Sequence, residues 1–323
     1  MAVMAIERDF EPVVARCRER HRELMETRPL TDAVRLFHGR GHTYPGFEDI
    51  NVDRLGRHLL VGSFGGSAPA NERLGRRLMT ELSGIAGVCV QSREGRRTQT
   101  TVVAGEVPEQ IVVTEAGLSF IVKPRRNQNV GLFLDMATVR HWVRMHADGR
   151  RVLNLFAYTC AFSVAALEGG AAGVVNVDMS RGALDWGADN HRQNGHRLPG
   201  RVWMLPHNVF RSWGKISRLG PYNLIIIDPP TNQQGSFNAE KQYGRVLKRL
   251  PELVAPGGGS GSASGAEIVA CLNSPFLDPE FLINQMARWC PRGRFKEFLP
   301  GSADFPDRYP DRALKVARFV LSA

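Results

Sequence analysis

The first part of the chain combines a helical hydrophobic pattern with several short apolar runs. Between residues 6 and 28, apolar residues recur at helical spacing among many charges, which predicts an amphipathic helix that ends before Pro29. A second helix is predicted over residues 71–83. Strands are predicted over residues 33–37, 58–64, 88–92, 100–103, 110–113 and 118–122. Residues 1–126 are therefore predicted to form a small α+β domain.

From about Gly131 onward the pattern changes to strands that alternate with helices. Strands are predicted over residues 152–156, 173–177, 202–205, 223–227, 268–271 and 316–321. Helices are predicted over residues 162–168, 182–194, 239–253 and 281–289. Apolar runs of this kind indicate a parallel sheet covered on both faces, so residues 127–323 are predicted to form a doubly wound α/β domain. The low-complexity run 257–265 should be a surface loop without chemistry.

Composition narrows the class of protein. The 323 residues are 43% hydrophobic and 23% charged, as in ordinary globular proteins, which excludes wholesale disorder. The sequence has no apolar run of about 18 residues, which excludes a transmembrane helix, and its first residues carry charges where a signal peptide needs an apolar core. Five scattered cysteines without a CxxC pair favour neither a disulfide framework nor a zinc site. We expect a soluble cytoplasmic protein without a metal.

The net charge of +10 suggests a class of partner. A basic surface attracts polyanions, of which nucleic acid is the commonest, although an arginine-rich composition spread evenly over the surface would give the same number. Two basic stretches, Arg93–Arg97 and Lys123–Arg126, are candidate phosphate contacts or, equally, solvated turns. The charge alone leaves both interpretations open.

Polar residues follow four of the predicted strands of the second domain. They lie in NLFAYTCAF (Asn154–Phe162), VDMS (Val177–Ser180), His207-Asn208 and IIIDPPT (Ile225–Thr231). Doubly wound sheets bind ligands at the carboxyl ends of their strands, near the point where the strand order reverses. The sequence therefore predicts a binding site at this edge.

The first two of these segments suggest the cofactor. Asp178 comes about 20 residues after the first loop, where an acid can accept hydrogen bonds from both ribose hydroxyls; alternatively, it caps the following helix together with Ser180. The loop AYTCAF has no glycine, which disfavours NAD and FAD and hence an oxidoreductase, and GxxxxGK[ST] is absent, which disfavours ATP and GTP. S-adenosylmethionine has a ribose and an adenine but no phosphate. A methyltransferase fits best.

The segment Asp228-Pro229-Pro230 is the sharpest local signal for catalysis. It places a carboxylate and an unpaired carbonyl, with two fixed φ angles, at the end of a buried strand. Such a turn can hold a planar amine or ring nitrogen in line with a methyl donor. The alternative is a rigid turn in which the aspartate only caps the backbone. These three residues are the predicted catalytic residues.

Four stretches together resemble a known family: NQNVGLFLDM (127–136), VLNLFAYTCAFSVAA (152–166), VDMSRGALDWGADNHRQNG (177–195) and IIIDPPT. They resemble the S-adenosylmethionine-dependent methyltransferases that act on bases of bacterial 23S ribosomal RNA. The guanine-N7 methyltransferase half of a fused large-subunit enzyme is most similar, followed by the cytosine-C5 enzymes that carry a PUA domain. The resemblance implies a class I Rossmann-like fold with an antiparallel last strand, here 316–321. It also implies a ribosomal RNA partner, which the N-terminal domain helps to grip.

The resemblance also implies roles for individual residues. The expected cofactor-binding residues are Gln128, Leu132, Asp135, Asn154, Phe156, Tyr158, Thr159, Asp178, Met179, Ser180, Asn208 and Asp228. Within this set, the stretch 128–135 would cover the methionine end, Asp178 would bind the ribose, Met179 would lie against the adenine and Asn208 near its amine. Asp228 and Pro229 would face the target base. Candidate substrate contacts are Arg125, Arg126, Asn273 and Phe237.

Three positions depart from the family pattern. Cys160 stands where the family usually has glycine and would crowd the methionine end, and Asn208 stands where an acid is usual. Thr231 and Asn232 follow the DPP segment where an aromatic residue is usual, so base stacking would fall to Phe237 or Tyr243. These departures keep open a second hypothesis, an RNA-binding protein with an inactive methyltransferase fold. A small-molecule methyltransferase is a third.

The two RNA reactions differ in what they need from the protein. Guanine N7 offers a lone pair, so alignment in a shielded pocket suffices. Cytosine C5 needs a cysteine that adds to the ring first, and Cys271 is the well-placed thiol. Most free cysteines are small buried hydrophobic residues, and no basic neighbour of Cys271 is evident. The sequence thus favours guanine N7 over cytosine C5.

Overall fold

The computed structural model describes residues 8–94, 97–126, 129–198, 200–230, 237–254 and 265–322. The chain divides into two compact units. The first runs to Leu134 and includes Ser302–Arg308, and the second comprises Asp135–Gly301 and the residues from Tyr309 onward. The domain boundary predicted between residues 126 and 127 precedes this division, and no sequence pattern marks Ser302–Arg308 as part of the first unit. All but the last residue of the low-complexity run lie outside the described residues.

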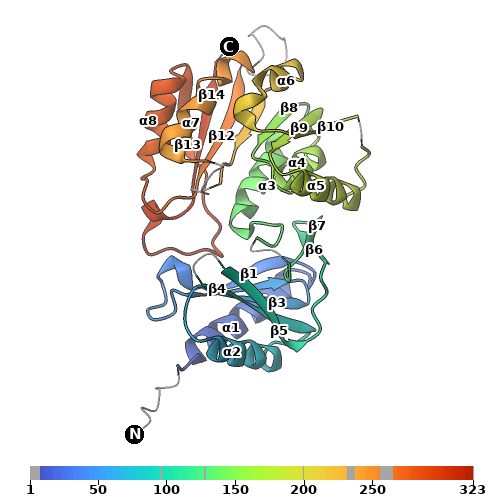
Figure 1. The fold of residues 1–323 in the computed structure, drawn as a ribbon, viewed down its shortest axis with the longest axis vertical. Helices are drawn as coiled ribbons and strands as arrows, with labels where there is room; N and C mark the ends of the chain where they lie inside the picture. Colours follow the sequence, from blue (N-terminus) through green and yellow to red (C-terminus); the bar gives the residue numbers. More distant parts are fainter. Residues whose placement is uncertain are drawn as a thin grey trace. The chain divides into compact units, whose positions relative to one another are not determined.

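The first unit is built on a five-stranded sheet with the order β1-β2-β3-β4-β5 (Figure 1). Its strands are β1 (Ala33–His38), β2 (Ile50–Leu55), β3 (His58–Ser63), β4 (Gly87–Glu94) and β5 (Arg97–Gly105). Neighbouring strands are antiparallel except β3 and β4, which are parallel and are connected through helix α2 (Ala68–Glu81). Helix α1 (Glu11–Thr27) packs beside α2 against the sheet, and a hairpin of β6 (Ile111–Glu115) and β7 (Leu118–Val122) follows.

Local chemistry explains where the elements of this unit differ from the prediction. Helix α2 begins earlier than predicted because the Ser67 hydroxyl accepts a hydrogen bond from the Ala70 backbone N–H (3.3 Å) and Pro69 fits the first turn. Strand β2 was not predicted because polar residues interrupt its apolar pattern. One of them, Arg54, is fully buried, so the pattern of polarity does not report the burial of this strand.

The second unit contains a seven-stranded sheet with the order β10-β9-β8-β11-β12-β14-β13. Its strands are β8 (Arg151–Leu155), β9 (Gly173–Asp178), β10 (Val202–Pro206), β11 (Leu224–Ile227), β12 (Ala266–Leu272), β13 (Gly293–Phe298) and β14 (Lys315–Leu321). The first five in this order are mutually parallel, and β14 lies antiparallel between β12 and β13. The predicted doubly wound sheet with an antiparallel last strand is confirmed. The order reverses between β8 and β11.

Helices cover both faces of this sheet, as predicted. Helices α3 (Ala137–His146), α4 (Ala161–Glu168) and α5 (Arg181–Gln193) lie on one face, and α6 (Trp213–Arg218), α7 (Ala239–Leu247) and α8 (Glu280–Trp289) on the other (Figure 1). The alternation of β-strand side chains separates two apolar cores, with Val152 and Ile226 facing α3 and α4, and Leu153 and Ile225 facing α7 and α8. Within the described residues, no helix is long and apolar enough to cross a bilayer.

Three elements of the second unit were not predicted, namely α3, α6 and β13. Strand β13 is almost entirely solvent-exposed at the sheet edge, so no buried face imposes an apolar alternation on its sequence GRFKEF. The helix predicted over residues 239–253 ends at Leu247 and is followed by a separate 3-10 turn, Leu250–Glu252. Pro251 explains the break, because proline cannot donate a backbone hydrogen bond within a helix.

Candidate active site

The candidate site lies where the strand order reverses. Strands β8 and β11 are parallel neighbours with Leu155 opposite Ile227, so the segments that follow them leave the sheet side by side. The first segment is the loop Phe156–Cys160, and the second begins with Asp228. Because β9 pairs with β8 on its other side, Asp178 at the end of β9 lies next to the same loop. The predicted convergence of these residues is therefore present.

Asp178 fixes the loop through both of its carboxylate oxygens. Oδ2 accepts a hydrogen bond from the Tyr158 backbone N–H (2.9 Å), and Oδ1 accepts one from the Ser180 backbone N–H (2.8 Å). Helix α5 is capped by the Ser180 hydroxyl, which accepts from the Ala183 backbone N–H (3.2 Å). The carboxylate of Asp178 is partly open to solvent and has further lone pairs, so it can accept hydroxyl donors as well.

The loop after β8 has an unusual backbone. Phe156, Tyr158 and Cys160 have φ angles of 61°, 47° and 61°, a left-handed region that non-glycine residues enter at a cost of about 1–3 kcal/mol each. Surrounding hydrogen bonds hold this conformation, including one from the Asn190 side chain to the Thr159 carbonyl (2.9 Å). The wholly buried Thr159 is therefore a support of the loop. These hydrogen bonds hold the strained backbone of the loop in place next to Asp178.

Cys160, which the resemblance led us to expect near the methionine end of the cofactor, packs into the protein interior. Its side chain is fully buried, and its Sγ lies 3.8 Å from Sδ of Met204. A Cβ atom placed on Gly187 of α5 would lie 2.4 Å from the Cys160 Sγ, so the thiol occupies the space that this glycine leaves. Burial raises the pKa of the Cys160 thiol, which therefore stays protonated. A glycine in α5 thus accommodates the side chain that the family pattern lacks in the loop.

The surroundings of Asp228 strongly perturb its pKa. Burial and the nearby Asp135 carboxylate raise this pKa, the guanidinium of Arg140 lowers it, and the net result is a rise from 3.8 to about 7. Pro229 is buried and Pro230 is partly exposed, so the proline turn holds Asp228 at the end of β11. The carboxyl group can therefore exist in either protonation state near neutral pH. Arg140 was not predicted, although an arginine beside Val139 on an apolar helix face could have indicated it.

Asn154 lies beneath the loop instead of lining it. Its side chain is 1% exposed, and its Nδ2 donates to the Asn176 Oδ1 on β9 (2.9 Å). Asn176 in turn donates to the Ser163 hydroxyl (2.9 Å), which meets Nε2 of His191 (2.9 Å). Among the described residues, the Asn154 Oδ1 has no partner. Asn154 was expected to contact the cofactor. It is instead part of a chain of buried polar side chains that supports the loop.

Met179 and Asn208 lie together at the ends of β9 and β10. Met179 is 56% exposed, and the Asn208 Nδ2 lies 3.6 Å from its Sδ. The Asn208 carbonyl oxygen accepts from the Phe210 backbone N–H (2.9 Å), so Asn208 also caps the short turn that follows. An exposed thioether beside an amide offers an apolar surface and a polar group to a flat ring.

Two aromatic residues expected to stack on a base are instead part of the core. Phe237 is 3% exposed. The centroid of its ring lies 5.2 Å from that of Phe156 and 6.2 Å from that of Tyr243. Tyr243 is fully buried, and its hydroxyl donates to the Cys271 carbonyl (3.0 Å). The correction follows from packing, because both rings belong to the apolar core between the sheet and α7. The sequence patterns did not single out Phe276, an 87% exposed ring that follows β12.

The remaining predicted residues lie in several places. Cys271 is buried, and burial together with the charge of Asp228 raises the pKa of its thiol well above the ordinary value. Asn273 is exposed at the end of β12. Leu132, Arg125 and Arg126 belong to the first unit. Leu132 is buried there, whereas the two arginines are exposed. Gln128, Thr231 and Asn232 lie outside the described residues.

The two arginines of the turn after β7 already have partners. Arg125 donates to the Val107 carbonyl (3.3 Å), and Arg126 lies 3.5 Å from a carboxylate oxygen of Glu109. Both interactions are at the surface, where an ion pair contributes about 0–1 kcal/mol. They leave the two side chains able to exchange these partners for a phosphate.

Comparison with known proteins also indicates a methyltransferase, the class expected from the sequence. Residues 34–320 match the family described as S-adenosylmethionine-dependent methyltransferase. The chain is 34% identical over 176 residues to ribosomal RNA large subunit methyltransferase I of Aeromonas salmonicida, which covers 53% of this chain and 44% of that protein. It is 31% identical over 261 residues to ribosomal RNA large subunit methyltransferase K/L of Shewanella loihica, covering 75% of this chain and 36% of that protein. The chain thus spans less than half the length of either relative.

A solved structure shares the fold. A methyltransferase crystallised with S-adenosylhomocysteine superimposes with a TM-score of 0.82 at 22% identity, covering 98% of this chain and 83% of that chain. The likeness extends over both units of the chain. The family match over residues 34–320 and the order of the seven-stranded sheet lead to one conclusion. This chain belongs to the S-adenosylmethionine-dependent methyltransferases.

Proposed function

We propose that this protein transfers the methyl group of S-adenosylmethionine to a base of large-subunit ribosomal RNA, at guanine N7. The observation that carries the proposal is the placement of Asp178, anchored by Tyr158 and Ser180, beside the Asp228 turn. Both relatives are named as ribosomal RNA large subunit methyltransferases, which suggests the class of RNA.

The residues that follow β9 and β10 suit this cofactor. Asp178 is available for the ribose hydroxyls, and the exposed Met179 is available for a face of the adenine. Asn208 can meet the adenine edge. When bound, S-adenosylmethionine supplies an electrophilic methyl group on a positively charged sulfur. The carboxylates of Asp228 and Asp135 favour positive charge at the reacting end.

The choice of guanine N7 follows from what each reaction requires of the chain. The Cys271 thiol is buried and protonated, which disfavours the covalent attack that cytosine C5 needs. Guanine N7 requires only that its lone pair is aligned with the methyl group. Methylation leaves a positive charge on the guanine ring, and the Asp228 carboxylate stabilises that charge. Phe276 and Asn273 are both exposed after β12, and under this proposal they contact the base.

The first test is calorimetric titration with S-adenosylmethionine. Wild type and Asp189→Ala should bind alike, because Asp189 is an exposed residue of α5 paired with Arg192 (2.5 Å). Asp178→Ala should lose binding. If the folded wild type does not bind, the proposed enzyme activity is wrong. The alternative, an RNA-binding protein with an inactive methyltransferase fold, would then remain.

The second test is methyl transfer from labelled S-adenosylmethionine to 23S ribosomal RNA. Mapping of the label to guanine N7 would support the proposal, and a label at cytosine C5 would overturn the choice of base. Phe276→Ala should reduce the transfer while leaving cofactor affinity unchanged, since the proposal assigns this ring to the base alone.

A further inference from the structure

The first unit carries three arginine side chains stacked on two phenylalanine rings. The guanidinium of Arg40 lies 4.2 Å from the centroid of the Phe64 ring, and that of Arg93 lies 4.8 Å from the same centroid. The guanidinium of Arg35 lies 4.5 Å from the centroid of Phe305. We call these five residues the arginine–phenylalanine cluster. Its members come from four separate segments of the unit, so the fold itself brings their charges together.

Among the described residues, a carboxylate pairs with Arg35 of the cluster but none pairs with Arg40. Arg35 forms a bidentate ion pair with Asp53 on β2, and one of its nitrogens lies 2.6 Å from the His38 Nδ1. Burial and the charges of Arg35 and Arg40 lower the pKa of His38 to about 3, so this ring is neutral. Arg93 donates from Nε (3.1 Å) and Nη2 (2.9 Å) to the uncharged side chain of Gln91. Arg35 and Arg40 therefore have one described carboxylate, Asp53, between them.

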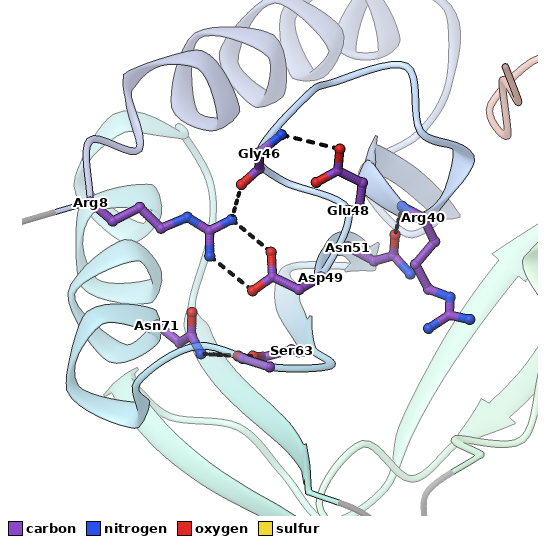
Figure 2. A network of polar contacts seen from close by, with 9 residues as sticks. Arg8, Arg40, Gly46, Glu48, Asp49, Asn51, Ser63 and Asn71 are labelled. Carbon is purple, nitrogen blue, oxygen red and sulfur yellow. Dashed lines mark hydrogen bonds and ion pairs between the residues drawn. The ribbon is translucent and has the colours of Figure 1, made fainter.

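Arg40 shows the imbalance most directly. Its backbone N–H donates to the Asn51 Oδ1 (3.4 Å), whereas its exposed guanidinium forms no hydrogen bond or ion pair with any described residue. Figure 2 shows this guanidinium directed away from the adjacent network, in which Arg8 is neutralised by Asp49. Burial and the charge of Arg35 lower the pKa of Arg40. Even so, guanidinium groups remain protonated in proteins, so the side chain is a cation held in place by Phe64.

We propose that the arginine–phenylalanine cluster binds the phosphodiester backbone of the RNA substrate. This inference rests on the proposed function for the identity of the partner. Stacked guanidinium groups present planar pairs of donors that match phosphate oxygens, and their rotamers are already restricted before binding. An RNA strand also offers bases to the partly exposed rings of Phe64 and Phe305, which an acidic polypeptide does not. RNA is therefore the partner that uses both halves of the cluster.

The test measures binding of a 23S ribosomal RNA transcript by the full chain across a range of salt concentrations. Arg40→Ala and Arg93→Ala should each weaken binding several-fold and reduce the slope of log affinity against log salt by about one unit. Arg40→Lys, which keeps the charge but loses the planar donors, should fall between Arg40→Ala and wild type. Arg76→Ala is the matched control, because this arginine lies on α2 of the same unit and is paired with Glu72 (2.8 Å). It should bind as wild type does.

The outcomes separate the inference from the function on which it rests. If wild type binds both S-adenosylmethionine and RNA, and the Arg40 and Arg93 variants match Arg76→Ala in affinity and slope, the cluster is not an RNA site. If polyglutamate displaces the RNA as effectively as unlabelled RNA of equal charge, the cluster takes carboxylates and the inference is overturned. If wild type binds S-adenosylmethionine but no RNA, the proposed substrate itself is wrong. Thermal unfolding of each variant verifies that the fold is intact.

Discussion

The ionisation of Asp228 makes its replacement by asparagine a stabilising change whose size depends on pH. The pKa of this carboxyl group is about 7 in the folded protein against 3.8 without the fold. Between these values the folded chain keeps a proton that the unfolded chain has lost, so the free energy of unfolding falls as the pH rises. A difference of about three pKa units corresponds to about 4 kcal/mol at 1.36 kcal/mol per unit. Above pH 7 the ionised Asp228 lowers the free energy of unfolding by this full amount.

Asp228→Asn removes that cost because the amide is neutral at every pH. The pKa of about 7 already includes the attraction to Arg140, so we expect a gain of up to about 4 kcal/mol at pH 8. Below pH 3.8 the carboxyl group is protonated in both states, and the gain should disappear. Urea unfolding of both proteins at several pH values between 4 and 8 measures the difference.

The control is Asp189→Asn, an exposed residue whose replacement should change the free energy of unfolding by less than about 0.5 kcal/mol at either pH. An Asp228→Asn protein that is no more stable than wild type at pH 8 would contradict the argument. So would a gain of the same size at pH 4 and pH 8, because a gain independent of pH cannot come from the ionisation of this carboxyl group.

Three further predictions concern the same unit. Affinity for S-adenosylmethionine should rise about tenfold from pH 6 to pH 8 as Asp228 ionises near pH 7, and calorimetry should find this rise absent in Asp228→Asn and smaller for uncharged S-adenosylhomocysteine. Gly187→Ala should lower the free energy of unfolding by about 1–3 kcal/mol through its contact with Cys160, and a Cys160→Gly second change should recover most of that loss in a urea titration. Cys271→Ala should retain methyl transfer to RNA within about twofold, and a large loss would point to covalent catalysis.

Much of the second unit could be predicted because its sequence and its burial agree. The strands 152–156, 173–177 and 223–227 are apolar runs buried on both faces, and each lies within a residue of its predicted place. The edge of the sheet that carries Asp178 and Asp228 followed from where the predicted strands end. These elements need no information beyond the local pattern.

The sequence pattern did not indicate which side chains would be exposed at that edge. Asn154 lies within β8, and Cys160 and Phe237 lie in the segments after β8 and β11, yet all three side chains turn into the protein because of partners on other elements. The thiol of Cys160 fills space beside Gly187, and the ring of Phe237 packs against Phe156. Burial of this kind depends on residues distant in sequence. It therefore becomes visible only in three dimensions.

The paired amides of Asn154 and Asn176 also have a consequence for how the sheet assembles. The two residues are direct partners across β8 and β9, within a layer that is otherwise aliphatic. If β9 slipped by one position, Asn176 would turn to the opposite face, among Leu153, Leu155 and Ile225, with no hydrogen-bond partner. Each buried amide would then cost about 1–3 kcal/mol. The pair therefore helps to fix the register of β8 and β9, and this register determines where Asp178 lies at the end of β9.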